Sequence, residues 1–262
     1  MPIIIPTSFS APVFYPESDY TVVKYMDITK FISLLYKKSL FFCRVDKLED
    51  KFEGKTAKPN YQGRVDDWKR WRESPYAQVK LSDDELIEKV KEDYEFEEKQ
   101  RSLHCIDCWN KKDNESAALW KIYSDFSKGI MVQSSIARLR RSFEQTSEQV
   151  QLSEIKYIHY ENQVMPDGNS NYPFLYKQIA YSYEKEVRLI YKVPTTDTSG
   201  WKYDWEKEEV EEGLYIKTDL NELIEKIVIS PYSPEWYFEL IRNIIKKYDL
   251  DKPVTKSEFS VY

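Results

Sequence analysis

Polar and apolar side chains alternate along residues 183–191, a stretch rich in β-branched and aromatic residues. This pattern predicts a β-strand, whose period of two places Glu184, Glu186 and Arg188 on one face and apolar side chains on the other. The apolar face has to pack against a core. The charged face has two interpretations. It is either a solvated surface on which Arg188 balances its neighbours, or a site in which Arg188 keeps Glu186 ionised for use on a ligand.

The composition allows a sizeable core despite abundant charge. Of 262 residues, 41% are hydrophobic, 15% are aromatic and 32% are charged, which suits one large domain or two small ones. The formal net charge is -6. General nucleic-acid binding is therefore not expected, because neutralising phosphates needs an excess of Lys and Arg.

Cysteine usage and apolar runs set the expected compartment. Three cysteines in a chain of this size do not make a disulfide framework, which indicates a reducing environment. The first residues lack a basic segment followed by a long apolar run, and no stretch has the length needed to cross a bilayer. We therefore expect a cytoplasmic protein without membrane contact.

The order of patterns predicts the fold class. Strands are expected at residues 20–25, 40–45, 103–109, 129–133, 150–160, 183–191, 214–217, 226–229 and 254–261. Helices are expected from Asp27 to about Lys38, at 115–123, after Ser134 or Ser135, as a turn at 172–178, and from Pro234 to about Tyr248. Because strands and helices mix without strict alternation, we predict an α+β fold: a mixed, mainly antiparallel sheet with flanking helices. One domain is expected over residues 1–262, with an irregular lead-in at about 1–18 and a helical insertion at about 58–101.

Several reaction classes lack their sequence motifs. The chain has six glycines and two histidines, without a Gly-rich phosphate loop or a nucleophile elbow, which excludes kinase, P-loop and Rossmann readings. Cys105 and Cys108 would point to opposite faces of their strand, so a zinc site is not expected there. A metal-dependent nuclease stays open, since a set of acidic residues would bind metal if the fold brought them together. These are Asp46, Glu49, Asp50, Glu53, Glu184 and Glu186.

A block of aromatic residues offers a second candidate feature. Trp109 precedes a short predicted helix that carries Trp120 and Tyr123. These rings either fill the core or form a cleft wall on which a planar ligand stacks.

Several stretches in order together resemble the bacterial domain-of-unknown-function family 2971. They are residues 23–25 (VKY), 40–53 (LFFCRVDKLEDKFE), 108–109 (CW), 118–130 (ALWKIYSDFSKGI), 183–189 (YEKEVRL) and 227–231 (IVISP). Near Asp46 the chain departs from the family pattern Asn-Asp-Pro-x-Glu, because residues 49–53 are EDKFE and lack the proline. The resemblance implies a fold more than a reaction.

The same pattern is more remotely similar to ADP-ribosyltransferases. In those enzymes an early strand bears a ring or a basic residue, an aromatic helix covers nicotinamide, and a late strand carries Glu-x-Glu. The corresponding substrate-binding positions here are Lys24 or Tyr25, then Trp120 and Tyr123. The catalytic positions are Glu186 as the catalytic carboxylate, Glu184 to orient the acceptor and Arg188 to fix Glu186.

The resulting functional hypothesis is an NAD-consuming, ADP-ribosyltransferase-like bacterial enzyme acting as a toxin or phage-defence effector. NAD is the expected substrate, a macromolecule is the expected acceptor, and no metal is expected. Two alternatives stay open: a non-catalytic ligand- or protein-binding module that uses the same aromatic cleft, and the metal-dependent nuclease.

Overall fold

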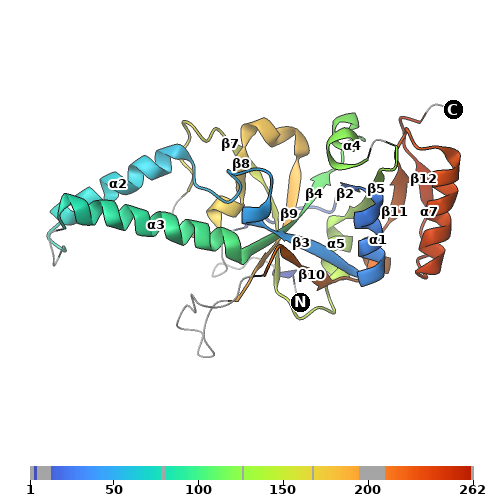
Figure 1. Ribbon diagram of the computed structural model, residues 1–262, viewed down its shortest axis with the longest axis horizontal. Coiled ribbons are helices and arrows are strands. Elements are labelled where there is room, and N and C mark those ends of the chain that lie inside the picture. Colours follow the sequence, from blue (N-terminus) through green and yellow to red (C-terminus); the bar gives the residue numbers. More distant parts are fainter. Residues whose placement is uncertain are drawn as a thin grey trace.

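One mixed sheet forms the centre of the protein in the computed structural model, which describes residues 3–4, 13–77, 81–125, 127–166, 168–194 and 210–260 (Figure 1). Its strands are β1 (Ile3–Ile4), β2 (Thr21–Met26), β3 (Ser39–Arg44), β4 (His104–Lys111), β5 (Ile130–Ser135), β6 (Val150–Glu154), β9 (Glu186–Lys192), β10 (Gly213–Lys217), β11 (Lys226–Ile229) and β12 (Val254–Lys256). The order is β1-β6-β9-β4-β2-β5-β11-β12, with β3 between β4 and β10. The β1–β6 and β11–β12 pairs are parallel and the other pairs are antiparallel. The predicted mixed, mainly antiparallel α+β fold is confirmed.

Helices lie on both faces and at one end of this sheet (Figure 1). They are α1 (Ile28–Lys37), α2 (Lys58–Glu73), α3 (Asp83–Leu103), α4 (Ala117–Tyr123), α5 (Ile136–Ser142), α6 (Leu220–Leu223) and α7 (Glu235–Lys247), with 3-10 turns η1 (Val45–Lys47), η2 (Tyr172–Phe174) and η3 (Ile179–Glu184). A small separate sheet joins β7 (Lys156–Ile158) to β8 (Tyr176–Gln178) in parallel.

The largest core cluster covers one face of the sheet. Helix α1 starts where expected, because the Asp27 carboxylate caps it by accepting from the backbone N–H of Lys30 at 2.8 Å. Its apolar stripe, with Phe31 and Leu35 fully buried, packs there together with α5, α6 and α7. This face therefore carries the bulk of the hydrophobic stabilisation.

The opposite face is covered by shorter elements. Helix α4 closes a small cluster that includes Tyr25, Trp120 and Val228. The η2 turn closes another, in which Phe174 packs with Ile106. This second face also carries the cluster of buried charged groups described below.

Helices α2 and α3 form a hairpin that extends away from the sheet (Figure 1). Ser82 starts α3 in a capping box, since its side chain accepts from Glu85 N–H and the Glu85 carboxylate accepts from Ser82 N–H. Helices are thus present where the insertion was expected.

Several expected elements differ from the observed ones; the strand expected at 254–261, for example, ends at Lys256 as β12. The strand expected at residues 183–191 begins at Glu186, because residues up to Glu184 form η3 and Lys185 takes a left-handed conformation at φ 45°. The strand expected at 150–160 is broken into β6 and β7. The turn expected at 172–178 is η2 followed by β8. In the described ranges, no helix combines the length and apolarity needed to cross a membrane.

Candidate active site

The register of β9 places its two charged residues on the face covered by α4 and η2. Glu186 lies opposite Asn110 of β4, and Arg188 lies opposite Cys108. Val187 and Leu189 point to the other face and belong to the main core. The period of two predicted for this strand is therefore present from Glu186 onward.

Glu186 is a buried carboxylate held on both oxygens. Its Oε1 accepts from Arg188 Nε at 2.7 Å, and its Oε2 accepts from Lys177 Nζ at 3.0 Å. Only 1% of the Glu186 side chain is exposed, and none of the Arg188 side chain is. The solvated-surface interpretation of this strand face is wrong, because a guanidinium with no exposed surface cannot balance charges in solvent.

Glu184, the last residue of η3, binds Lys177 as well. Its Oε2 accepts from Lys177 Nζ at 2.7 Å, and its Oε1 accepts from the Tyr123 hydroxyl. The amide of Asn110 donates to the Glu184 backbone carbonyl at 2.9 Å and fixes the turn. Glu184 therefore joins the site through η3 rather than as part of the strand.

Glu53 closes the cluster from the opposite side. Arg188 Nη1 donates to Glu53 Oε1 at 2.7 Å and to the Phe174 carbonyl at 2.8 Å. Lys177 Nζ lies 3.8 Å from Glu53 Oε2. Glu53, Lys177, Glu184, Glu186 and Arg188, called here the Glu186 network, combine three carboxylates with two cations.

Burial and the neighbouring charges shift the pKa values of Glu186, Glu53 and Lys177. Burial alone would raise the pKa of Glu186, but the charges of Arg188 and Lys177 outweigh it and hold this pKa well below its usual range. Burial raises the pKa of Glu53 in spite of Arg188. The pKa of Lys177 is raised, because Glu186 and Glu53 outweigh the effect of burial. Of Glu186 and Glu53, Glu186 is thus the carboxylate that the surroundings hold in its ionised form.

Helix α4 connects the network to the aromatic residues singled out in the sequence. Trp120 is buried, packs edge-on against Tyr25 with ring centroids 4.9 Å apart, and donates Nε1–H to Glu115 at 3.2 Å. Tyr123, one turn further, is 40% exposed and donates to Glu184. Trp120 and Tyr25 therefore form core beneath the site, whereas Tyr123 lies at its surface.

Lys24 is not brought to the network. Its neighbour Val23 pairs with Asn110. Because successive residues of a strand point to opposite faces, Lys24 on β2 points to the other face of the sheet from Val23. There its ammonium binds Asp107 Oδ1 at 2.6 Å and the Cys108 carbonyl at 2.9 Å. The sheet thus separates Lys24 from Glu186.

Sequence reasoning gave no role to Lys177 and counted Glu53 only among the acidic candidates. Lys177 precedes the predicted strand at residues 183–191, and the side-chain alternation of a strand does not connect it to Glu186, because η3 intervenes. Glu53 precedes Gly54, which adopts a φ of +73° that favours glycine. In the sequence, the glycine directly after Glu53 was the available signal of a bend at this acidic residue.

The acidic residues considered for a nuclease converge only in part. Glu53, Glu184 and Glu186 meet, but Lys177 and Arg188 lie between them. Asp46 instead forms a two-bond pair with Arg44, at 2.7 Å for each bond. Among the described residues no group of three or more His, Cys, Asp or Glu side chains could hold a metal ion.

The cysteines are arranged as the strand pattern predicts. Cys105 is buried in the main core, and Cys108 packs against the Phe174 cluster on the other face. Burial, and then the nearby charge of Glu186, raises the pKa of the Cys108 thiol well above its usual value. Cys108 therefore borders the Glu186 network as an uncharged thiol.

Comparisons with known proteins give limited information. No family model matches the chain, and a search of curated proteins also finds no match, so the resemblance to family 2971 stays a prediction. Two solved structures of Thermus sp. 2.9 DarT are similar to it. The complex with carba-NAD+ has 12% identity and a TM-score of 0.38, covering 94% of this chain and 98% of that chain. The complex with NAD+ has 11% identity and a TM-score of 0.40, covering 94% and 100%. At such TM-scores the likeness supports no conclusion about this chain's fold or activity.

Proposed function

We propose that this protein is an NAD-consuming, ADP-ribosyltransferase-like enzyme whose catalytic carboxylate is Glu186. The observation that carries the proposal is the state of this side chain: it is 1% exposed, yet two cations hold it ionised. Carboxylates with strongly shifted pKa values are concentrated at catalytic sites, and Tyr123, which is 40% exposed, borders this network.

The chemistry follows from what an ionised carboxylate does to a glycosidic bond. As the bond between nicotinamide and ribose breaks, its electron pair leaves with nicotinamide and positive charge builds on the ribose. A fixed carboxylate that binds the ribose hydroxyls stabilises this oxocarbenium-like state. An incoming ribose hydroxyl would replace Lys177 Nζ on Glu186 Oε2, while Arg188 keeps Oε1 in place.

The neighbouring residues take supporting roles in this scheme. Glu184 orients the acceptor and accepts the proton that the acceptor loses. The Tyr123 hydroxyl donates a hydrogen bond to the Glu184 carboxylate and positions it at the exposed edge of the site. Lys177 Nζ, which lies 4.8 Å from the centre of the Tyr181 ring, would be displaced from Glu186 by the substrate. Trp120 anchors α4 in the core by packing against Tyr25, and in this scheme neither ring contacts NAD.

Direct binding and transfer test the proposal. Calorimetric titration with NAD should show saturable binding, and labelled NAD with a cell lysate should leave label on an acceptor. Glu186→Gln should abolish label transfer, while Glu161→Gln, which removes an exposed carboxylate paired with Lys58, should keep it. Absence of both NAD binding and transfer in the wild type would refute the proposal. Binding without turnover, unchanged in Glu186→Gln, would instead favour a non-catalytic binding module.

A toxin or phage-defence role is the corresponding proposal for the cell. Induced expression of the wild type should arrest growth of a bacterial host, and Glu186→Gln at equal protein level should not. Equal growth arrest by both proteins would show that toxicity does not depend on Glu186.

A further inference from the structure

Strand β10 is an open edge of the main sheet. It pairs with β3 on one side, and in the described part of the chain no strand pairs with it on the other. Figure 1 shows β10 at the lower margin of the sheet. An edge of this kind presents unpaired N–H and C=O groups, which can pair with a strand of another molecule. Nothing in the proposed reaction uses this edge.

The bonds to β3 show which backbone groups of β10 face outward. Arg44 N–H donates to the Glu212 carbonyl at 3.0 Å, and Thr218 N–H donates to the Lys38 carbonyl at 3.1 Å. In an antiparallel pair, residues that bond the partner alternate with residues that face away from it. The even-numbered residues of β10 therefore bond β3. The residues that direct their N–H and C=O groups outward are Gly213, Tyr215 and Lys217. No other described residue bonds these outward groups.

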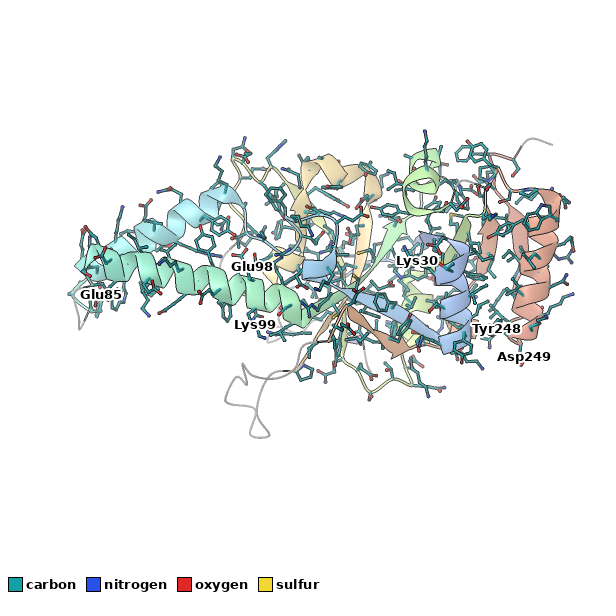
Figure 2. All side chains as sticks on the ribbon, in the orientation of Figure 1. Lys30, Glu85, Glu98, Lys99, Tyr248 and Asp249 are labelled. Atoms are coloured by element: carbon teal, nitrogen blue, oxygen red, sulfur yellow. The ribbon has the colours of Figure 1, made fainter. Side chains whose placement is uncertain are left out.

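The edge of β10 lacks the features that protect β12, the last strand at the other end of the sheet. β12 has three residues and directly follows Pro253, and both a short strand and a proline discourage pairing. β10 has five residues without a proline. Its Tyr215 ring, 42% exposed, packs against Phe41 with ring centroids 5.0 Å apart. Lys37 of α1, the helix on which Figure 2 labels Lys30, lies over the same ring at 4.5 Å. The edge is thus accompanied by an exposed, ordered aromatic side chain.

The sequence of β10 is complementary to a second copy of itself. Glu211 and Glu212 precede the strand and Lys217 ends it. An antiparallel copy therefore brings the lysine of each chain toward the acidic start of the other. A two-fold axis at Tyr215 pairs all five residues of the strand, and it sets Lys217 opposite Gly213, which has no side chain to collide with it. The three outward-facing residues of each chain then exchange about six N–H···O bonds.

We propose that this protein forms a two-fold symmetric dimer in which β10 pairs antiparallel with β10 of a second copy, centred on Tyr215. The two sheets become one continuous sheet. Five paired residues from each chain bury less than about 1,200 Å², the size class of weak, transient complexes, so we expect dissociation at micromolar concentrations. The dimer does not involve the Glu186 network. Failure of this inference and failure of the proposed reaction are therefore distinguishable.

Sedimentation velocity of the full chain measures the association. Between about 2 and about 200 μM, a range suited to weak complexes, the average mass should rise from that of one chain toward that of two. Tyr215→Lys places two like charges opposite each other at the axis and should weaken association at least about 10-fold. Its circular dichroism spectrum should be unchanged, because the side chain is partly exposed. Tyr76→Lys, at an 85% exposed position beyond α2, should associate as the wild type does.

Cysteine cross-linking tests the register independently of the lysine variant. At the axis the two copies of residue 215 have Cα atoms about 5.5 Å apart, within the range of about 4.4–6.8 Å that a disulfide spans. Phe41 pairs with Tyr215 on β3, so its two copies are separated by three strand spacings, about 14 Å. Mild oxidation should therefore link Tyr215→Cys into a covalent dimer, whereas Phe41→Cys and the wild type should stay unlinked.

Three results would overturn the inference. The first is a chain that sediments as one copy over the whole concentration range. The second is a dimer that Tyr215→Lys leaves intact, because association would then use another surface. The third is equal cross-linking of Tyr215→Cys and Phe41→Cys, because the β10 pair places only the first of these positions within disulfide distance.

Discussion

Removing the guanidinium from the Glu186 network gives the sharpest test of its electrostatics. Arg188→Met keeps most of the side-chain length but deletes three bonds: to Glu186 at 2.7 Å, to Glu53 at 2.7 Å and to the Phe174 carbonyl at 2.8 Å. Lys177 then remains as the cation facing three buried carboxylates. The variant thus leaves negative charge buried without a partner.

The expected cost follows from these contacts. Each hydrogen bond between charged groups contributes about 1.5–3 kcal/mol, and breaking a buried ion pair from one side typically costs about 3–5 kcal/mol. A small part of this loss of stability is offset, because Arg188 Nη2, which is buried without a partner in the described part of the chain, is removed with the side chain. We expect the free energy of unfolding to fall by about 3–5 kcal/mol at pH 8.

The loss should depend on pH in a defined direction. The folded-state pKa of Glu53 is already raised by burial, and removal of Arg188 raises it further. A carboxyl group whose folded pKa exceeds its unfolded value near 4.3 favours the folded state at low pH and disfavours it as pH rises. The deficit of Arg188→Met relative to the wild type should therefore be largest at pH 8 and shrink toward pH 5.

Urea unfolding followed by tryptophan fluorescence at pH 5, 6, 7 and 8 measures this deficit. Arg141→Met is the matched control: its guanidinium pairs with Glu222 at 2.8 Å, but both side chains are more than 40% exposed. That variant should lose less than about 1 kcal/mol at every pH. A loss below about 1 kcal/mol for Arg188→Met, or a deficit that grows toward pH 5, would refute this electrostatic account.

Three further predictions concern local structure and acid stability. Asp27→Ala removes the cap of α1 and should lower the free energy of unfolding by about 1 kcal/mol, whereas Asp27→Asn should retain most of it; equal losses in urea unfolding would contradict this. Gly54→Ala places a Cβ 2.7 Å from Phe174 Cε1 at a φ of +73° and should lower the free energy of unfolding by at least about 1 kcal/mol. Gly63→Ala has open space around it in α2 and should raise the free energy of unfolding by about 0.5–1 kcal/mol. Burial lowers the pKa of His104 to about 3, so the unfolded chain binds a proton there as pH falls below about 6.5 and the folded chain does not. Stability should fall between pH 6.5 and 5, and His104→Phe should show a shallower slope in the same titration; identical slopes would exclude this histidine as the cause.

Much of the architecture was predictable because it depends on local periodicity. The Asp27 cap, the Ser82 capping box and the alternation of Glu186 to Arg188 are contained in short stretches of sequence, and the structure has them. The boundary at Glu184 was missed because a left-handed residue at Lys185 interrupts the strand pattern, and no glycine marks it.

The composition of the site was less predictable because it depends on contacts between distant segments. Arg188 was correctly expected to hold Glu186, since the two residues are neighbours on one strand face. Its bond to Glu53 joins residues 135 positions apart, and no spacing rule gives that contact. Trp120 and Tyr123 look equivalent in sequence, but one is buried beneath the site and the other is exposed at its edge.

Release of nicotinamide from NAD is the measurement that most directly tests the central claim that the Glu186 network is catalytic. With purified wild type and a cell lysate as the source of acceptor, we predict steady release of nicotinamide. With Glu186→Gln, folded as judged by an unchanged circular dichroism spectrum, the rate should fall by at least about 100-fold, the scale of a lost electrostatic contact to the transition state. Equal rates for wild type and folded Glu186→Gln would contradict the assignment, and the Glu186 network would then be a structural element of the fold.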